Sequence, residues 1–166
     1  MPTRFLVSLV VQLSLVACSV ALPRGPNAAT VQEGGIEYRL ETASPSFELG
    51  EVVRLIYSVT NTTHETFQPG MVPNCEYCIQ QFHATRDDQE VWRTCRVIPP
   101  CGWAEFSLAP GETRKWVEKW ALTNDNGTLE PGDDFPLDPG IYTIAAELYL
   151  STTVGRVPVS IELHIE

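Results

Sequence analysis

The chain has 166 residues, of which 43% are hydrophobic and 19% are charged. This balance is typical of one globular domain and excludes a disordered chain. The formal net charge of −10 at pH 7 repels nucleic acid and anionic lipid, because both carry negative charge. We therefore expect no nucleic-acid partner, and contact with a membrane only through a lipid anchor.

The start of the chain has the pattern of a targeting segment. Arg4 supplies a positive charge, and residues 5–17 form a short, mostly apolar run. A membrane-spanning helix needs about 20 residues, so residues 1–17 indicate a signal peptide instead. The run ends in Leu15-Val16-Ala17-Cys18, which is similar to the bacterial lipoprotein box, where the cysteine is lipidated. Ordinary cleavage after Ser19 or Ala21 is the alternative.

A lipidated Cys18 predicts a protein anchored in the cell envelope and facing outside the cytoplasm. Residues 18–35 contain Pro23, Pro26 and the pair Gly34-Gly35. Prolines and glycines at this density predict a flexible tether. The folded domain is then expected over residues 36–166.

The first half of this domain alternates hydrophobic and polar residues over 36–41 and 53–60, which predicts two strands joined through a turn at 48–51. Residues 61–73 are polar and contain Pro69-Gly70, so they predict a loop. The next expected element is a hairpin. Its strands are predicted over 78–86 and 91–95, around a turn at 87–90, and a second loop follows over 96–102.

The second half continues the same pattern. A strand ending near Leu108 leads into the turn at Pro110-Gly111, and residues 113–122 predict a strand. Residues 123–136 predict a long acidic loop, and residues 141–150 and 154–165 predict the last hairpin. No stretch combines helix caps with a 3.6-residue period, so we expect no helix after the signal peptide.

Short strands separated by regular turns predict an all-β fold, namely an immunoglobulin-like antiparallel β-sandwich of about seven to nine strands. Tyr142 follows the Pro139-Gly140 turn at the start of a strand. This placement matches a tyrosine corner, in which the hydroxyl bonds the backbone upstream; a tyrosine that merely begins a strand is the alternative. The core is expected around Leu55, Tyr57, Tyr142 and Ile144.

Four of the five cysteines, Cys75, Cys78, Cys95 and Cys101, flank the predicted hairpin. Four thiolates can bind zinc, but the spacing of Cys95 and Cys101 is longer than a usual Cys-x-x-Cys pair. An even set in an exported chain favours two disulfides over zinc and over a redox role. Three connectivities are possible, and the hairpin favours Cys78–Cys95 with Cys75–Cys101. Closing a loop of this size with a disulfide stabilises a fold by about 2–4 kcal/mol.

The loop held between these cysteines is the candidate partner-binding loop: Arg96, Val97, Ile98, Pro99 and Pro100, with Trp103 at its edge. No set of residues has a catalytic pattern, because the three histidines fall in distant elements and no serine lies in a nucleophile elbow. The acidic residues of the long loop lack EF-hand spacing, so they indicate a solvated loop rather than a calcium site. We expect no enzyme activity, no metal and no cofactor.

Several turn and core motifs occur in a fixed order along the chain: Phe47-x-Leu49-Gly50-x-x-Val53, the strand ending in Asn61, Val91-Trp92-Arg93, Leu108-x-Pro110-Gly111-Glu112 with Trp116, and Leu137-x-Pro139-Gly140-x-Tyr142. Together they resemble the intracellular proteinase inhibitor (BsuPI) domain family over about residues 46–150. The resemblance implies an immunoglobulin-like sandwich and inhibition of a serine proteinase. The export signal and the four cysteines depart from the founding member of that family.

The resemblance implies an envelope-anchored proteinase inhibitor that binds a serine proteinase through its loop. The alternative, which the sequence supports at least as well, is a non-inhibitory extracytoplasmic module, immunoglobulin-like in fold, that binds or scaffolds another protein. Immunoglobulin-like sandwiches carry many binding roles, so the fold does not choose between the two.

Overall fold

The computed structural model describes residues 25–74, 78–94, 102–124, 135–151 and 156–166. Within these ranges the chain forms strands and no helix. The described part of the chain therefore has no helix long and apolar enough to cross a membrane. The strands are β1 (Asn27–Glu33), β2 (Ile36–Thr42), β3 (Ser46–Phe47), β4 (Val53–Asn61), β5 (Phe67–Pro73), β6 (Gln80–Arg86), β7 (Gln89–Arg93), β8 (Trp103–Leu108), β9 (Thr113–Trp120), β10 (Thr123–Asn124), β11 (Phe135–Pro136), β12 (Gly140–Leu148) and β13 (Val159–Ile165).

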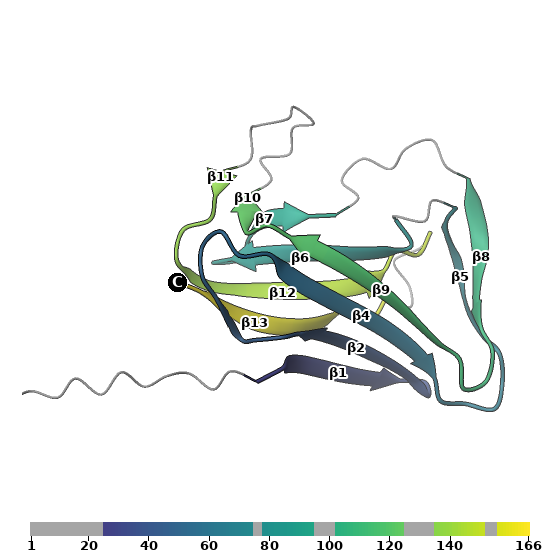
Figure 1. Cartoon of the computed structure of the whole chain (residues 1–166). Helices are drawn as coiled ribbons and strands as arrows, with labels where there is room; N and C mark the ends of the chain where they lie inside the picture. Colours follow the sequence, from purple (N-terminus) through teal and green to yellow (C-terminus); the bar gives the residue numbers. More distant parts are fainter. Residues whose placement is uncertain (1–24, 75–77, 95–101, 125–134, 152–155) are drawn as a thin grey trace, which may run out of the picture.

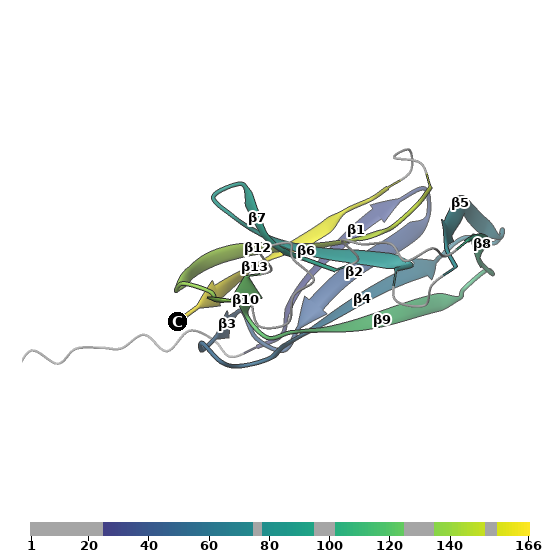
Figure 2. The same cartoon turned by 90° about the horizontal axis from the view of Figure 1, so that it is seen from above.

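Two sheets form the body of the molecule (Figures 1 and 2). One has the strand order β1-β2-β4-β9, and the other has the order β3-β13-β12-β6-β7. Neighbouring strands are antiparallel except for the short parallel pair of β3 and β13. This arrangement confirms the predicted all-β sandwich.

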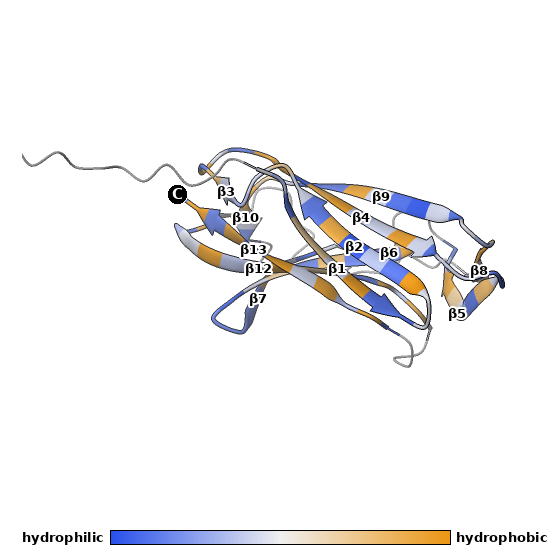
Figure 3. Cartoon of the chain, turned by 90° about the horizontal axis from the view of Figure 1, so that it is seen from below, coloured by the Kyte–Doolittle hydropathy of each residue, from blue (hydrophilic) through white to orange (hydrophobic). Residues whose placement is uncertain are grey.

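The core lies between the inner faces of these sheets. Leu55 and Tyr57 of β4 and Ile144 of β12 have no exposed surface, and Tyr142 has 1% exposed. Successive side chains of a strand point to opposite faces, so the alternating sequence buries one face and leaves the other in water, as the hydropathy bands of Figure 3 indicate. The predicted core residues are therefore confirmed.

The start of β12 is fixed by Tyr142. Its hydroxyl donates a hydrogen bond of 2.7 Å to the carbonyl oxygen of Asp138, four residues upstream. The guanidinium of Arg86 on β6 donates in turn to the Tyr142 hydroxyl at 3.2 Å. The hydroxyl-to-backbone bond predicted from the position of Tyr142 is thus present, and it ties β12 to the preceding turn.

The tether predicted over residues 18–35 is wrong for its last part, because residues 27–33 form β1 and pair with β2 along their whole length. Gly34 and Gly35 make the turn of this hairpin, with positive φ angles of 57° and 77°. A two-residue turn with both φ angles positive suits glycine, because glycine has no Cβ to clash. The glycine pair therefore marks a hairpin rather than a linker.

The loop predicted over residues 61–73 is also wrong, since residues 67–73 form β5 and pair with β8. The register of this pair shifts between Phe67 and Gly70, and an irregularity of this kind accommodates proline in a strand. The hairpin turn predicted at 87–90 is shorter: Asp87 and Asp88 alone make it, with φ angles of 50° and 62°. Part of the predicted acidic loop pairs as β10 and β11.

Candidate protein-binding surface

The ribbon formed by β5 and β8 lies at the end of the sandwich remote from the C terminus (Figures 1 and 2). Its inner side is apolar, since Val72, Phe106 and Leu108 are buried. The pairing extends beyond the strands, because the N–H of Asn74 donates to the carbonyl of Gly102 at 2.8 Å. The ribbon therefore closes one end of the core and carries its other side outward.

Trp103, the first residue of β8, lies on that outward side with 44% of its surface exposed. Its ring stacks on the ring of Tyr149, with centroids 6.3 Å apart and planes 16° apart. The guanidinium carbon of Arg156 lies 4.9 Å from the centroid of the same tyrosine ring. This distance is within the range of a cation–π contact, so Tyr149 contacts both Trp103 and Arg156, and the three large side chains form one cluster.

Met71 of β5 belongs to the same surface. The register pairs Pro73 with Trp103 and Met71 with Glu105. Residues two apart on a strand, and residues opposite each other across a pair, point to the same face. Met71 therefore shares the face of Trp103, and 41% of it is exposed. We call Met71, Trp103, Tyr149 and Arg156 the Trp103 platform.

Main-chain hydrogen bonds hold the platform from below. The N–H of Tyr149 donates to the carbonyl of Ile79 at 2.9 Å, and the N–H of Ser151 donates to the carbonyl of Met71 at 2.9 Å. The segment after β12 is thus fastened both to the approach of β6 and to β5. Because backbone rather than surface side chains makes these bonds, the stack has a fixed base.

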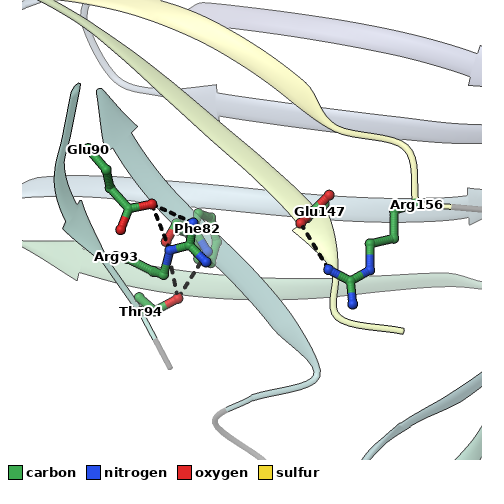
Figure 4. A network of polar contacts seen from close by, with 6 residues as sticks. All are labelled: Phe82, Glu90, Arg93, Thr94, Glu147 and Arg156. Carbon is green, nitrogen blue, oxygen red and sulfur yellow. Dashed lines mark hydrogen bonds and ion pairs between the residues drawn. The ribbon is translucent and has the colours of Figure 1, made fainter. Parts of the chain in front are cut away.

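The charge of Arg156 is held in place by acceptors on the same side. A guanidinium nitrogen lies 3.8 Å from a carboxylate oxygen of Glu147, and another donates to the carbonyl of Leu150 at 2.6 Å. Figure 4 places the Glu147–Arg156 pair on the sheet face that also carries Arg93, which pairs with Glu90. The platform therefore presents an oriented cation beside two aromatic rings.

A histidine lies on the same sheet between these charges. His83 of β6 is paired across the strands with Arg93 and with Ala145. Burial and the positive charge of Arg93 lower its pKa from 6.5, while Glu147 and Glu90 act in the opposite direction. Its buried Nδ1 has no hydrogen-bond partner among the described residues. The geometry thus favours the neutral imidazole.

The structure describes only part of the site predicted from the sequence. Trp103 lies on the platform, but as the start of a strand rather than in a loop. The rest of the predicted binding loop, residues 96–100, lies outside the described residues, as do Cys18, Cys75, Cys95 and Cys101. Cys78 is buried with 3% exposed. The lipidation and the disulfide pairing therefore stay predictions.

Sequence reasoning missed Met71, Tyr149 and Arg156. A signal for Tyr149 was present, because Leu148 and Leu150 are its hydrophobic neighbours and an alternating strand must turn the residue between them outward. No comparable signal marks Met71, which lies in a segment predicted as a loop. Its partner strand is distant in the sequence, so only the fold brings it to the surface.

The three histidines, which could serve in catalysis or metal binding, lie on separate elements. His64 lies in the loop after β4, His83 on β6 and His164 on β13. No cluster of three or more histidine, cysteine, aspartate or glutamate side chains suited to a metal ion occurs among the described residues. The Trp103 platform, in contrast, brings an exposed tryptophan, a methionine, a tyrosine and an arginine together on one side of the described molecule.

No family model and no curated protein matches the sequence. Among solved structures, the chain is similar to a β-glucosidase from Listeria innocua (14% identity, TM-score 0.41, 79% of this chain and 16% of that chain). It is also similar to a β-glucosidase from Erythrobacter marinus (15%, 0.43, 85% and 16%) and to the C-terminal domain of wzt (12%, 0.43, 84% and 78%). The chain spans about one sixth of the glucosidase chains. At these TM-scores the likenesses carry no functional argument, and the resemblance to the BsuPI family stays a prediction.

Proposed function

We propose that the protein is a binding module rather than an enzyme, and that a protein partner docks on the Trp103 platform. The observation that carries this proposal is the exposed Trp103 ring, which lies nearly parallel to the Tyr149 ring at a centroid distance of 6.3 Å, with the guanidinium of Arg156 near the same tyrosine. Tryptophan, tyrosine and arginine are the residues most enriched among those that dominate binding energy at protein interfaces. A ring that is already ordered loses little entropy on binding, which favours affinity.

The predicted disulfides extend the platform toward the Arg96–Pro100 loop. Asn74 and Gly102 directly precede Cys75 and follow Cys101 in the sequence, and their backbones are hydrogen-bonded at 2.8 Å. This contact supports a Cys75–Cys101 bridge at the base of the loop. Cys78 is buried and is not a free thiol, which supports its participation in the second bridge. We propose that the loop contributes to the same recognition surface as the platform.

The partner class that we propose is a serine proteinase, because the ordered motifs resemble the BsuPI family. In this form of the proposal the protein inhibits the proteinase by occupying its cleft with the loop while the platform contacts the rim. The non-inhibitory module differs only in its partner, since the same exposed stack would serve both roles. Inhibition therefore separates the two forms of the proposal.

We propose that the protein is located in the cell envelope, with Cys18 lipidated after removal of residues 1–17. Replacing Cys18 with alanine should release the protein from the membrane fraction or leave the precursor unprocessed. Mass spectrometry of the wild-type protein should find a lipid on Cys18. An unmodified, fully soluble wild-type protein would overturn the anchor while leaving the platform unaffected.

The platform is tested by measuring inhibition and binding against a panel of serine proteinases at micromolar concentrations. Trp103→Ala should weaken a positive interaction by about thirtyfold, the effect of losing about 2 kcal/mol at an interface centre. Val117→Ala is the matched control, because Val117 is 46% exposed on β9, away from the platform. Equal binding by Trp103→Ala and the wild type would overturn the platform. Binding without inhibition would leave the non-inhibitory module.

A further inference from the structure

The outer edge of β1 is unpaired among the described residues, because β1 is the last strand of its sheet. The register of the β1–β2 hairpin determines which backbone groups lie on this edge. The turn at Gly34-Gly35 closes on the pair Glu33 and Ile36, and a two-residue turn closes on a hydrogen-bonded pair. Hydrogen-bonded and non-hydrogen-bonded pairs alternate along an antiparallel ladder.

The alternation assigns the inward bonds to Asn27, Ala29, Val31 and Glu33, which pair with Thr42, Leu40, Tyr38 and Ile36. The N–H and C=O groups of Ala28, Thr30 and Gln32 therefore point away from β2. None of these three has a backbone partner in another described segment. They form a row of donors and acceptors with the spacing that another strand requires.

The side chains of β1 do not block this row. The strand Asn27-Ala-Ala-Thr-Val-Gln-Glu33 contains no lysine, arginine or proline, and its pairing with β2 has no bulge. Edge strands of native proteins usually carry such devices against pairing with other chains. The opposite edge of the same sheet has them: on β9, Arg114, Lys115 and Lys119 are exposed.

We infer that β1 is a dimerisation strand, which pairs antiparallel with β1 of a second copy of the chain across a two-fold axis at Thr30. Centred there, Ala28 lies opposite Gln32 of the second copy and Thr30 lies opposite Thr30, and each pair exchanges two hydrogen bonds. This register uses the three free residues and no others. The β1-β2-β4-β9 sheet of one copy then continues into the same sheet of the second copy.

The register centred on Thr30 also avoids placing like charges opposite each other. The sole charged residue of β1, Glu33, lies opposite Asn27 of the second copy rather than opposite another carboxylate. On the inner face, Ala29 lies opposite Val31, so small apolar side chains meet. The net charge of −10 opposes association of two copies, and we therefore expect a dimer that strengthens as salt screens this repulsion. The inference is independent of the Trp103 platform.

Sedimentation equilibrium of the full chain, solubilised in detergent and measured over a range of concentrations, tests the inference. We expect a monomer–dimer equilibrium for the wild type. Thr30→Pro removes one edge N–H but no bond to β2, because Thr30 and Arg39 form a non-hydrogen-bonded pair. This variant should keep the melting temperature and weaken the dimer by at least about tenfold, the equivalent of 1.4 kcal/mol.

Thr30→Lys supplies a second, conformationally milder variant, since it places two like charges opposite each other at the axis. Val117→Lys is its matched control, because it adds the same charge to the other edge of the sheet and should leave the dimer intact or stronger. A wild type that is monomeric at every concentration and salt would overturn the inference. A dimer that survives both Thr30 variants would overturn the assignment of β1 as its interface.

Discussion

On the side of the sandwich formed by β9 and β7, the rings of Trp120 and Trp92 stack with centroids 5.1 Å apart and bridge the two sheets. On the side formed by β1 and β13, the Asn27 side chain donates a hydrogen bond of 2.6 Å to the carbonyl of Glu162 and so joins the two sheets. We refer to these as the β9 side and the β1 side. The edge strand β9 carries large rings and exposed cations, whereas the edge strand β1 carries mostly small side chains and no cation.

The difference shows that the two edges of this sheet have different roles: one contributes to the stability of the core, and the other remains accessible to a partner. Trp120 is 1% exposed and also packs edge-on against Tyr142 of β12, so the β9 side is part of the core. Most of β1 is exposed, so its ordering depends on pairing with β2 more than on burial. A strand held in this way adds little to the core but keeps a free edge. The strand that contributes to the core and the strand with the free edge therefore lie at opposite edges of one sheet.

The largest difference in stability between the two sides is expected when the Trp120 ring is removed from the β9 side. Trp120→Ala should lower the free energy of unfolding by about 3–5 kcal/mol, because it leaves a large cavity in the core. Val31→Ala on the β1 side, where the side chain is 36% exposed, should change it by no more than about 0.5 kcal/mol. Urea unfolding followed by circular dichroism gives both values. Similar losses for the two variants would contradict the comparison.

A smaller effect is expected at the end of β4, where adjacent residues hold the turns of the two sides. The Asn61 side chain is fully buried and donates to the carbonyls of Leu108 and Ala109 near the β9 turn. The exposed Thr62 hydroxyl donates to the carbonyl of Gly35 in the β1 turn. These neighbours therefore allow a matched test of the two sides.

Asn61→Ala should cost about 1–3 kcal/mol, because it removes the donor to the carbonyl of Leu108, whose hydrogen bond is buried. Thr62→Ala should cost at most about 0.5 kcal/mol, since its bond is exposed to water. Hydrogen exchange should show faster opening at the Gly111 amide, which donates to the carbonyl of residue 61, in the first variant, and at the amide of residue 62, which donates to the carbonyl of Gly35, in the second. A larger loss of unfolding free energy from Thr62→Ala than from Asn61→Ala would contradict the conclusion that the β9 side contributes more to stability than the β1 side.

The smallest effect concerns pH and belongs to the β6–β7 pair. Because the folded protein lowers the pKa of His83 below 6.5, the unfolded chain binds this proton more tightly. The stability that neutral His83 contributes is complete above pH 6.5 and is lost as the pH falls from there toward the lowered folded value.

His83→Gln should therefore flatten the decline of unfolding free energy between about pH 7 and pH 5. His64→Gln, in the exposed loop after β4, is the matched control and should leave the decline of the wild type unchanged. Thermal melts at a series of pH values measure both. A steeper decline in His83→Gln would show that the sign of the shift is wrong.

The sandwich was predictable because its central strands alternate, as Val53, Leu55, Tyr57 and Val59 do with intervening residues that are polar except for Ile56. The edge strand β1 was not, because Ala28 and Ala29 lack strand preference and Gly34-Gly35 suits a linker as well as a turn. Its order comes from β2, which supplies the hydrogen bonds. That contribution is tertiary and leaves no local pattern.

The same reasoning explains what was found of the candidate site. Trp103 was predicted because it lies beside Cys101 in the sequence, where a recognition loop was expected. Arg156 follows β12 by several residues, and its contact with Tyr149 depends on how the chain returns toward β13. Side chains that meet only after the sheets have packed cannot be paired from spacing alone.

The buried amide of Asn61 also has a practical consequence for producing the protein. Asn61-Thr62-Thr63 is an N-glycosylation acceptor sequence, and the Asn61 nitrogen that a sugar would occupy is the one that donates to the carbonyls of Glu65, Leu108 and Ala109. In a eukaryotic secretory host, a glycan added to the nascent chain would prevent those bonds and keep β4 from closing on the β8–β9 turn. Once folded, the chain would shield the same amide from the transferase. Bacterial expression avoids this competition.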